Sequence, residues 1–443
     1  MHLQTWLRAV AMAGVTSAVL TVSPIRVQAQ YGATYEQEPV SYSSPAVDDA
    51  VARLQKRLDA GEAILKYDDC NGYLRSVLEL LEIPVSSQML VFSKTSFQRD
   101  RISPAAPRAV YFNDSAYVGS VQQGEVIEIS AVDPQKGSIF YTLDQQPAER
   151  PVFRRQTHNC LQCHDSSMSL GVPGHVVRSV WPDANGLPIL SAGTFVTNHS
   201  SPLYERWGGW YVTGTHGDLR HMGNVCVPRS RDHQSPAAID RSSGANVVDL
   251  AERCDIAPYL APHSDIVALM VFEHQTHAQN LITRANHQTR FALRDEETMN
   301  RALGRAADER LDSTTSRIKS ACEPLVAYLL FAEEVPLSAT IQGTSTFAAE
   351  FAGRGPRDSR GRSLRDFDLE RRMFRYPLSY VFYSDAFSAL PGAAKDYIHR
   401  RLWQVLAGED TSRKFSHLTE PVRQAVLEIV RETVPDLPDY WKR

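Results

Sequence analysis

The amino-terminal third of the chain shows helical and then strand-like hydrophobic periods. Apolar residues recur at near-helical spacing over 48–66 and again over 73–81. Five short β-favouring runs follow, separated by Pro, Gly and Asn-Asp turn signals, at 89–92, 109–112, 117–121, 126–132 and 138–143. We predict two amphipathic helices and then an antiparallel sheet, which we interpret as a scaffold because no nucleophile or metal cluster lies within it.

The pattern changes after the predicted sheet. The region 147–260 is rich in loops and short extended runs, and 228–245 reads as a polar, exposed loop. A long helix is expected from Asp265 to Leu293, with Ser264 or Asp265 as its N-cap. Further helices are predicted over 296–311, 316–331, 394–405 and 420–434.

These patterns together predict an α+β fold. Amino-terminal helices and an antiparallel sheet occupy 46–146, a loop- and β-rich region occupies 147–260, and a helical region occupies 261–443. Within the last region, 343–365 combines four glycines with five arginines, which predicts a flexible Arg/Gly loop. The loop is expected to be solvated, and the alternative is that its cations dock an anionic partner or cofactor.

The first 29 residues have the composition of a signal peptide. Arg8 precedes an apolar run from Ala9 to Val22, and small residues stand at Val27 and Ala29, the positions that signal peptidase reads. We expect cleavage after Ala29, export from the cytoplasm, and a flexible leader over 30–45. An uncleaved anchor is the alternative, and no later stretch is apolar enough to span a membrane.

Charge, length and missing motifs exclude several classes of function. Removing 1–29, which hold Arg8 and Arg26 and no acidic residue, takes the formal net charge from −4 to −6. An acidic protein is a poor general partner for nucleic acid. The 443 residues far exceed a minimal electron carrier, and the sequence lacks a Gly-x-Ser-x-Gly elbow, a phosphate loop or a hydrolase-like pair of carboxylates.

The chemistry of the chain centres on Cys160-Leu161-Gln162-Cys163-His164. Two cysteines separated by two residues can form thioether bonds to the vinyl groups of a haem, while the next histidine coordinates the iron. The alternatives are a redox dithiol and half of a zinc site. The histidine directly after the second cysteine and the lack of a second Cys-x-x-Cys pair argue against both. We predict one covalently attached haem c, with His164 as the proximal ligand, which export supports because bacterial c-type haem is attached outside the cytoplasm.

The motif resembles the attachment motif of c-type cytochromes. The phrases at 91–95, 128–133 and 375–380 are similar to large, exported, single-haem bacterial proteins without an assigned reaction. The resemblance implies a bacterial periplasmic or secreted protein with a redox, electron-transferring role and a redox partner protein. The segment 151–157 replaces the helix that precedes the motif in small soluble cytochromes, so we expect a larger scaffold around the haem.

The sixth coordination position of the iron has several candidates. Met222 follows His164 by a distance compatible with the distal methionine of small cytochromes, and His221 and His216 are its rivals. A sixth protein ligand would favour electron transfer. An open face would favour a peroxidase- or oxygenase-like haem enzyme, and a binding module with a structural or sensory haem is the third hypothesis.

A second group of polar residues lies on the predicted long helix. Glu273 and His277 are four residues apart and share one face of the helix, and His274 lies one turn before His277. Residues 158–287, which include this stretch, hold eleven of the fourteen histidines. We interpret the two histidines as hydrogen-bonded and partly buried. A role in the haem pocket or an independent metal site are the alternatives.

Four cysteines remain after the haem pair. In an oxidising compartment an even number suggests two disulfides. We favour Cys226 with Cys254, because they flank one polar excursion, and then Cys70 with Cys322. Three connectivities remain open.

Overall fold

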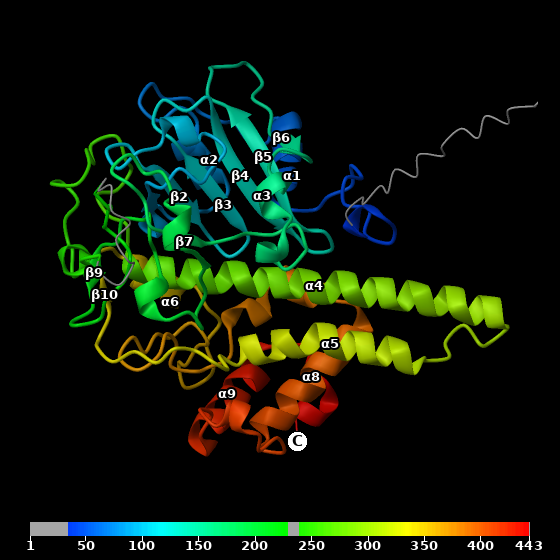
Figure 1. The fold of residues 1–443 in the computed structure, drawn as a ribbon. Coiled ribbons are helices and arrows are strands. Elements are labelled where there is room, and N and C mark those ends of the chain that lie inside the picture. The colour runs from blue at the N-terminus through cyan, green and yellow to red at the C-terminus, as the bar shows by residue number, and fades with distance from the viewer. Residues whose placement is uncertain (1–33, 229–238, 443) are drawn as a thin grey trace, which may run out of the picture.

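The computed structural model describes residues 34–228 and 239–442, so the predicted signal peptide lies outside the described residues. The fold is α+β, as predicted. A six-stranded antiparallel sheet runs in the order β1-β2-β3-β4-β5-β6, each strand pairing with its sequence neighbour (Figure 1). Its strands are β1 (Met89–Val91), β2 (Arg108–Phe112), β3 (Ala116–Ser120), β4 (Val126–Asp133), β5 (Gly137–Asp144) and β6 (Arg154–Gln156). The five predicted strands are thereby confirmed.

Helices cover both faces of the sheet because strands such as β2 bury apolar side chains on both sides. On β4, Ile127, Ile129 and Ala131 pack in one core with the two predicted amino-terminal helices, α1 (Ala50–Asp59) and α2 (Leu74–Leu80). The alternate residues of the strand face the other side, since side chains along a strand alternate between the two faces. The helix α4 (Ile266–Leu303) crosses that second side (Figure 1).

The long helix α4 begins as predicted and ends later than predicted. Asp265 is its N-cap, and its carboxylate accepts hydrogen bonds from the backbone N–H groups of Val267 and Ala268. The helix continues through the predicted break near residue 294 and ends at Gly304, which adopts a left-handed φ of 66°. The separate helix predicted over 296–311 was therefore wrong, because its first half continues α4.

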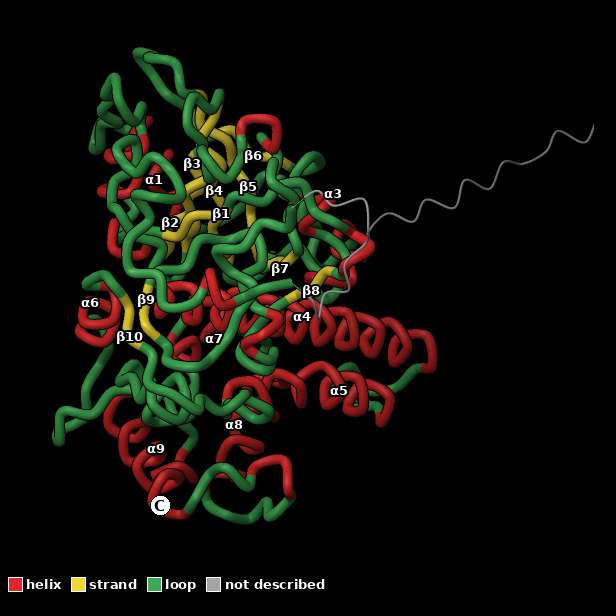
Figure 2. The backbone as a smooth tube through the Cα atoms, turned by 60° about the vertical axis from the view of Figure 1, so that its left-hand side comes forward, coloured by secondary structure: helices red, strands yellow, loops and turns green. Residues whose placement is uncertain are grey.

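The carboxy-terminal helices form a layer beneath α4. Figure 2 shows the sheet, α4, and then α5, α8 and α9 from top to bottom. These helices and the shorter ones near them are α5 (Asp312–Leu329), α6 (Phe347–Gly353), α7 (Asp385–Ser388), α8 (Gly392–Leu406) and α9 (Glu420–Thr433). None of the helices in 34–228 and 239–442 has the length and apolar character needed to cross a membrane.

The middle region is loop-rich, as predicted, with little regular structure. Its elements are α3 (Leu161–His164), the two-stranded sheet of β7 (Arg178–Val180) and β8 (Thr194–Val196), and β9 (Gly214–Thr215), which pairs with β10 (Gln342–Gly343). Backbone hydrogen bonds and short 3-10 turns connect them. This region holds the predicted haem motif.

Two segments predicted to be flexible are packed instead. From Thr34 onward the leader folds against the sheet, where the Tyr42 hydroxyl donates to the backbone oxygen of Ser138. The predicted Arg/Gly loop contains α6, and four of its five arginines make ion pairs. Those pairs are Arg357 with Asp366, Arg360 with Glu428, Arg362 with Asp358 and Glu428, and Arg365 with Asp114.

Candidate functional site

The predicted haem motif folds as one helical turn over the sheet. Cys160 is the N-cap residue of α3, and its backbone oxygen accepts a hydrogen bond from the His164 N–H at 3.0 Å. Leu161 is buried and anchors the turn, whereas Cys160 is half-buried and Cys163 is exposed. Since positions i, i+3 and i+4 share a helix face, the two thiols and the imidazole lie on one side of the turn.

The imidazole of His164 is held in a single tautomer. Its Nδ1 lies 2.9 Å from the backbone oxygen of Gly174, and because a carbonyl oxygen only accepts, Nδ1 carries the proton. Burial lowers the pKa of His164, so the ring is neutral near pH 7. The second nitrogen, Nε2, therefore keeps its lone pair. This is the usual state of a metal-ligating histidine, whose other nitrogen donates to a carbonyl or carboxylate.

A loop fixed by α4 supplies the carbonyl group that holds His164. The backbone N–H of Gly174 also donates to the backbone oxygen of His164 at 3.0 Å, so the two residues bind each other twice. Asn280 of α4 accepts from the His175 N–H at 3.0 Å and donates to the His175 oxygen at 2.7 Å. A Cβ on Gly174 would lie 2.2 Å from Asn280 Oδ1, so only glycine fits between helix and loop.

The side chain of His175 connects the same loop to the sheet. Its Nε2 lies 2.7 Å from the Ser130 hydroxyl on β4, and its Nδ1 lies 3.0 Å from the Ser138 hydroxyl on β5. The ring of His164 packs against Phe140 of β5, with 4.7 Å between ring centroids. The orientation of His164 is therefore set jointly by the loop, the sheet and α4.

An ion pair lies beside the motif on the same face of the sheet. Arg108 of β2 and Glu128 of β4 are 2.8 Å apart and act electrostatically on both Cys160 and His164. Burial, reinforced by Glu128, raises the pKa of Cys160 to about 11. A thiol that resists ionisation is a weak redox nucleophile, so this environment disfavours the interpretation of the motif as a redox dithiol.

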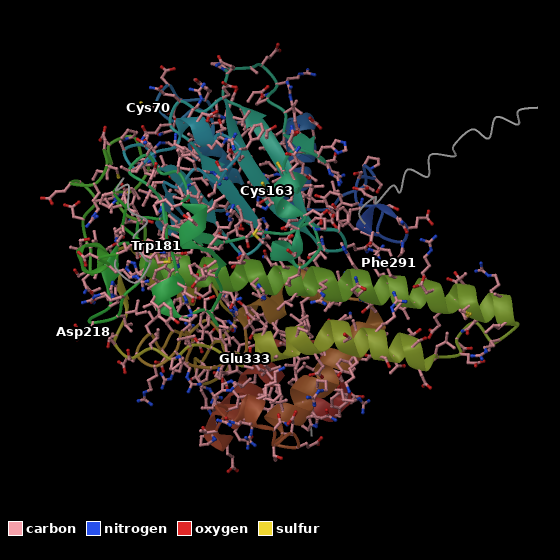
Figure 3. The ribbon with its side chains drawn as sticks, viewed as in Figure 1. Cys70, Cys163, Trp181, Asp218, Phe291 and Glu333 are labelled. Atoms are coloured by element: carbon pink, nitrogen blue, oxygen red, sulfur yellow. The ribbon has the colours of Figure 1, made fainter. Side chains whose placement is uncertain are left out.

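The distal candidates lie in another part of the middle region. Met222 is buried in a cluster with Trp181, and Figure 3 shows Trp181 and Cys163 at separate positions in front of the sheet. The rings of His216 and His221 are 4.8 Å apart. In the described part of the chain, no hydrogen bond or ring contact joins any of these three candidates to His164.

Backbone contacts also give His216 and His221 the wrong tautomer for binding iron. The N–H of Asn246 donates to Nε2 of His216 at 3.1 Å, and the N–H of Gly223 donates to Nδ1 of His221 at 3.0 Å. A ring nitrogen that accepts is unprotonated, so the proton of each neutral ring sits on the other nitrogen. Neither ring has a free lone pair, unlike His164. These contacts argue against both histidines as distal ligands.

The polar residues of α4 form a buried core of their own. Glu273 and Arg206 make an ion pair at 2.7 Å, with side-chain exposures of 0% and 4%. Nδ1 of His274 lies 2.8 Å from Nδ1 of His199, and His277 packs against Tyr328. The contacts of His274 fit the interpretation as a hydrogen-bonded histidine, although it is fully buried, whereas His277 is partly buried and makes a ring contact. Within 34–228 and 239–442, no group of three or more His, Cys, Asp or Glu residues is placed to hold a metal ion.

The six cysteines are unbonded thiols in this structure. Cys226 and Cys254, the favoured disulfide pair, lie in one neighbourhood, since both raise the pKa of the Tyr211 hydroxyl in addition to its burial. Cys70 is exposed near the top of the sheet (Figure 3). Cys322 is fully buried on α5, beneath α4. The structure therefore does not bring together the second predicted pair.

The residues that position His164 were missed in the sequence. Gly174 and His175 stand in an ordinary Gly-Val-Pro-Gly-His turn, and Asn280 lies more than a hundred positions after the motif. The glycine was the one available signal, because an unexplained glycine can mark a close approach of two segments. Nothing local to Asn280 or Arg108 distinguishes them from other polar residues on a helix or strand.

The buried histidines predict a fold that is unstable in acid. Burial lowers the pKa of His221 and His274 to about 3, and of His277 and His287 to about 4. Unfolded histidines have a pKa of about 6.5. Between these values the unfolded chain binds more protons than the folded one, so stability falls as the pH drops below about 6.5.

We expect the free energy of unfolding, from urea titrations, to be lower at pH 5 than at pH 7.5. Burial raises the pKa of Glu273 and Glu334 to about 7, so these two carboxyl groups favour the folded state as the pH falls. The four histidines outnumber them. The variant His277→Gln should lose stability less steeply in acid. Equal or greater stability at pH 5 would show that the histidines are not held neutral.

No family model, no curated protein and no solved structure matches the chain.

Proposed function

We propose that this chain carries one covalently attached haem c, bound through Cys160 and Cys163 with Nε2 of His164 as the proximal iron ligand, and that it transfers electrons outside the cytoplasm. The hydrogen bond from His164 Nδ1 to the Gly174 oxygen carries the proposal, because it leaves Nε2 free for a metal. The two thiols stand one helical turn apart on the same side as this imidazole, as a haem with two vinyl groups requires.

When bound, the haem supplies a one-electron Fe(III)/Fe(II) couple. The protein contributes the environment of that couple. Gly174 keeps the proton on Nδ1 of His164, which makes Nε2 a stronger donor and favours the oxidised state. Cys163 is exposed, so this residue would hold the group where a redox partner protein can approach it.

Absorption spectra test the proposal directly. The exported protein, expressed with a haem-maturation system, should show a c-type α band when it is reduced. Absence of that band would contradict haem binding. Electron paramagnetic resonance of the oxidised protein then reports the distal ligand, since a low-spin signal requires a strong sixth ligand.

A haem enzyme of peroxidase- or oxygenase-like type is the second candidate function. The observation that favours it is the tautomer of His216 and His221, together with their lack of contact with His164. An open sixth position would bind carbon monoxide or cyanide rapidly and give a high-spin signal. A six-coordinate, low-spin spectrum that resists both ligands would instead support electron transfer.

The variant Gly174→Ala tests the positioning of His164. Its Cβ would collide with Asn280 and displace the carbonyl group that holds Nδ1, so we expect a higher reduction potential. Overpacking of this kind also costs about 1–3 kcal/mol of stability. Spectroelectrochemical titration measures the potential. The matched control is Gly353→Ala, whose Cβ meets nothing within 4 Å, and equal potentials in the two variants would contradict the positioning role.

A further inference from the structure

A cavity of about 630 Å³ lies on the opposite side of α4 from the haem motif. Figure 3 shows Glu333 at this position, below α4, and Cys163 above it. Three segments line the cavity: the residues that follow α5, a turn near residues 371–372, and the 3-10 helix Arg413–Phe415 with the residues after it. None of them belongs to the proposed haem site.

Hydrogen bonds fix the three segments to one another. The N–H of Leu337 donates to the Arg371 oxygen at 2.9 Å. The N–H of Met373 donates to Glu334 Oε1 at 2.8 Å, and Nε2 of His417 donates to the Leu330 oxygen at 2.8 Å. The shape of the cavity is therefore fixed by contacts among all three segments and does not depend on the conformation of one loop.

The lining of the cavity has an excess of positive charge. Arg371, Arg372, Arg413 and Lys414 line it, and none of them makes an ion pair within the described residues. The arginines of the 354–365 segment behave differently, since four of the five are neutralised by carboxylates. The opposing acids in the cavity are Glu333 and Glu334.

Two further observations bear on these acids and on the floor of the cavity. Burial raises the pKa of Glu334 to about 7, so this carboxyl group offsets only part of the positive charge at neutral pH. Phe331 and Glu333 adopt left-handed φ angles of 55° and 69°. Bulky residues rarely adopt this conformation, and such backbone strain concentrates at binding sites.

We propose that this cavity binds a small polyanion that carries phosphate or carboxylate groups. Its volume falls within the range of about 300–1,000 Å³ that is typical of small-molecule sites. Arginine guanidinium groups bind both anions through paired hydrogen bonds. A concave site of this size, lined by three segments, favours a small ligand over an acidic protein surface.

Isothermal titration of the full exported protein with pyrophosphate and with citrate, at fixed ionic strength, tests the proposal. We expect saturable binding of at least one of them, weakened about a hundredfold by Arg372→Gln with Arg413→Gln, since each lost charged hydrogen bond is worth roughly a factor of ten. The pyrophosphate and citrate arms distinguish phosphate from carboxylate chemistry. The matched control pair, Arg53→Gln with Arg301→Gln, removes two exposed cations elsewhere and should leave binding unchanged.

Three outcomes would overturn the proposal. The first is no saturable binding of either anion, and the second is equal weakening by the control pair, which would indicate a non-specific charge effect. The third is that a decaglutamate peptide binds more tightly than either anion and that the Arg372→Gln, Arg413→Gln pair weakens this binding. That result would make the cavity a docking site for an acidic protein. Each variant's spectrum and unfolding curve verify that it is folded, and the result does not depend on whether haem is bound.

Discussion

Replacing Cys160 and Cys163 together by serine is expected to abolish covalent haem attachment. Serine cannot form the thioether bonds, and the exposed turn offers no other cysteine, since Cys160 and Cys163 are the two thiols of α3 and its cap. Haem staining after denaturing electrophoresis measures the covalent fraction. The wild-type chain should stain, and the double variant should not.

A third cysteine provides the control for this experiment. Cys70 is also exposed but lies apart from the motif, so Cys70→Ser should stain like the wild-type protein (Figure 3). Staining of the double variant would place the attachment elsewhere. Absence of staining in the wild-type protein would exclude covalent haem altogether.

Arg206→Met is expected to be among the most destabilising substitutions in the chain. It removes the partner of Glu273, whose side chain is 0% exposed, and leaves a carboxyl group buried without its cation. Breaking one partner of a buried ion pair costs about 3–5 kcal/mol. Urea unfolding at pH 7.5, where Glu273 is more ionised than in acid, measures the loss.

A double variant separates the charge effect from lost packing. Adding Glu273→Gln to Arg206→Met removes the uncompensated charge, so part of the lost stability should return. The loss in the single variant should also diminish at lower pH, as Glu273 becomes protonated. A loss of under 1 kcal/mol in Arg206→Met, or no recovery in the double variant, would contradict a role of the ion pair in the core.

The sequence predicted correctly those elements that depend on residues close together in the chain. Period-two runs such as 126–132 became strands, and Asp265 capped α4, because alternation and capping act over a few residues. The length of α4 was misjudged because its polar second half reads as a helix end in isolation. Packing against α5 and the cap at Gly304 decide that boundary.

Only the part of the candidate site that consists of adjacent residues could be predicted from the sequence. The spacing from Cys160 to His164 carries both thiols and the imidazole that we propose as the proximal ligand. Asn280 reaches the same site from 116 positions after His164, and its function depends on a tertiary contact that no sequence period reports. For the same reason the tautomers of His216 and His221 could not be foreseen, since backbone N–H groups in the folded loops determine them.

Mass spectrometry of one proteolytic fragment tests the haem assignment most directly. Cleavage after Arg155 and Arg178 releases residues 156–178, which contain Cys160, Cys163 and His164 and no other cysteine. We predict that this fragment, from protein expressed with a haem-maturation system, carries the mass of one haem, with neither thiol available for alkylation. A fragment of unmodified mass whose two cysteines alkylate freely, or which contains a Cys160–Cys163 disulfide, would contradict the proposed haem c centre.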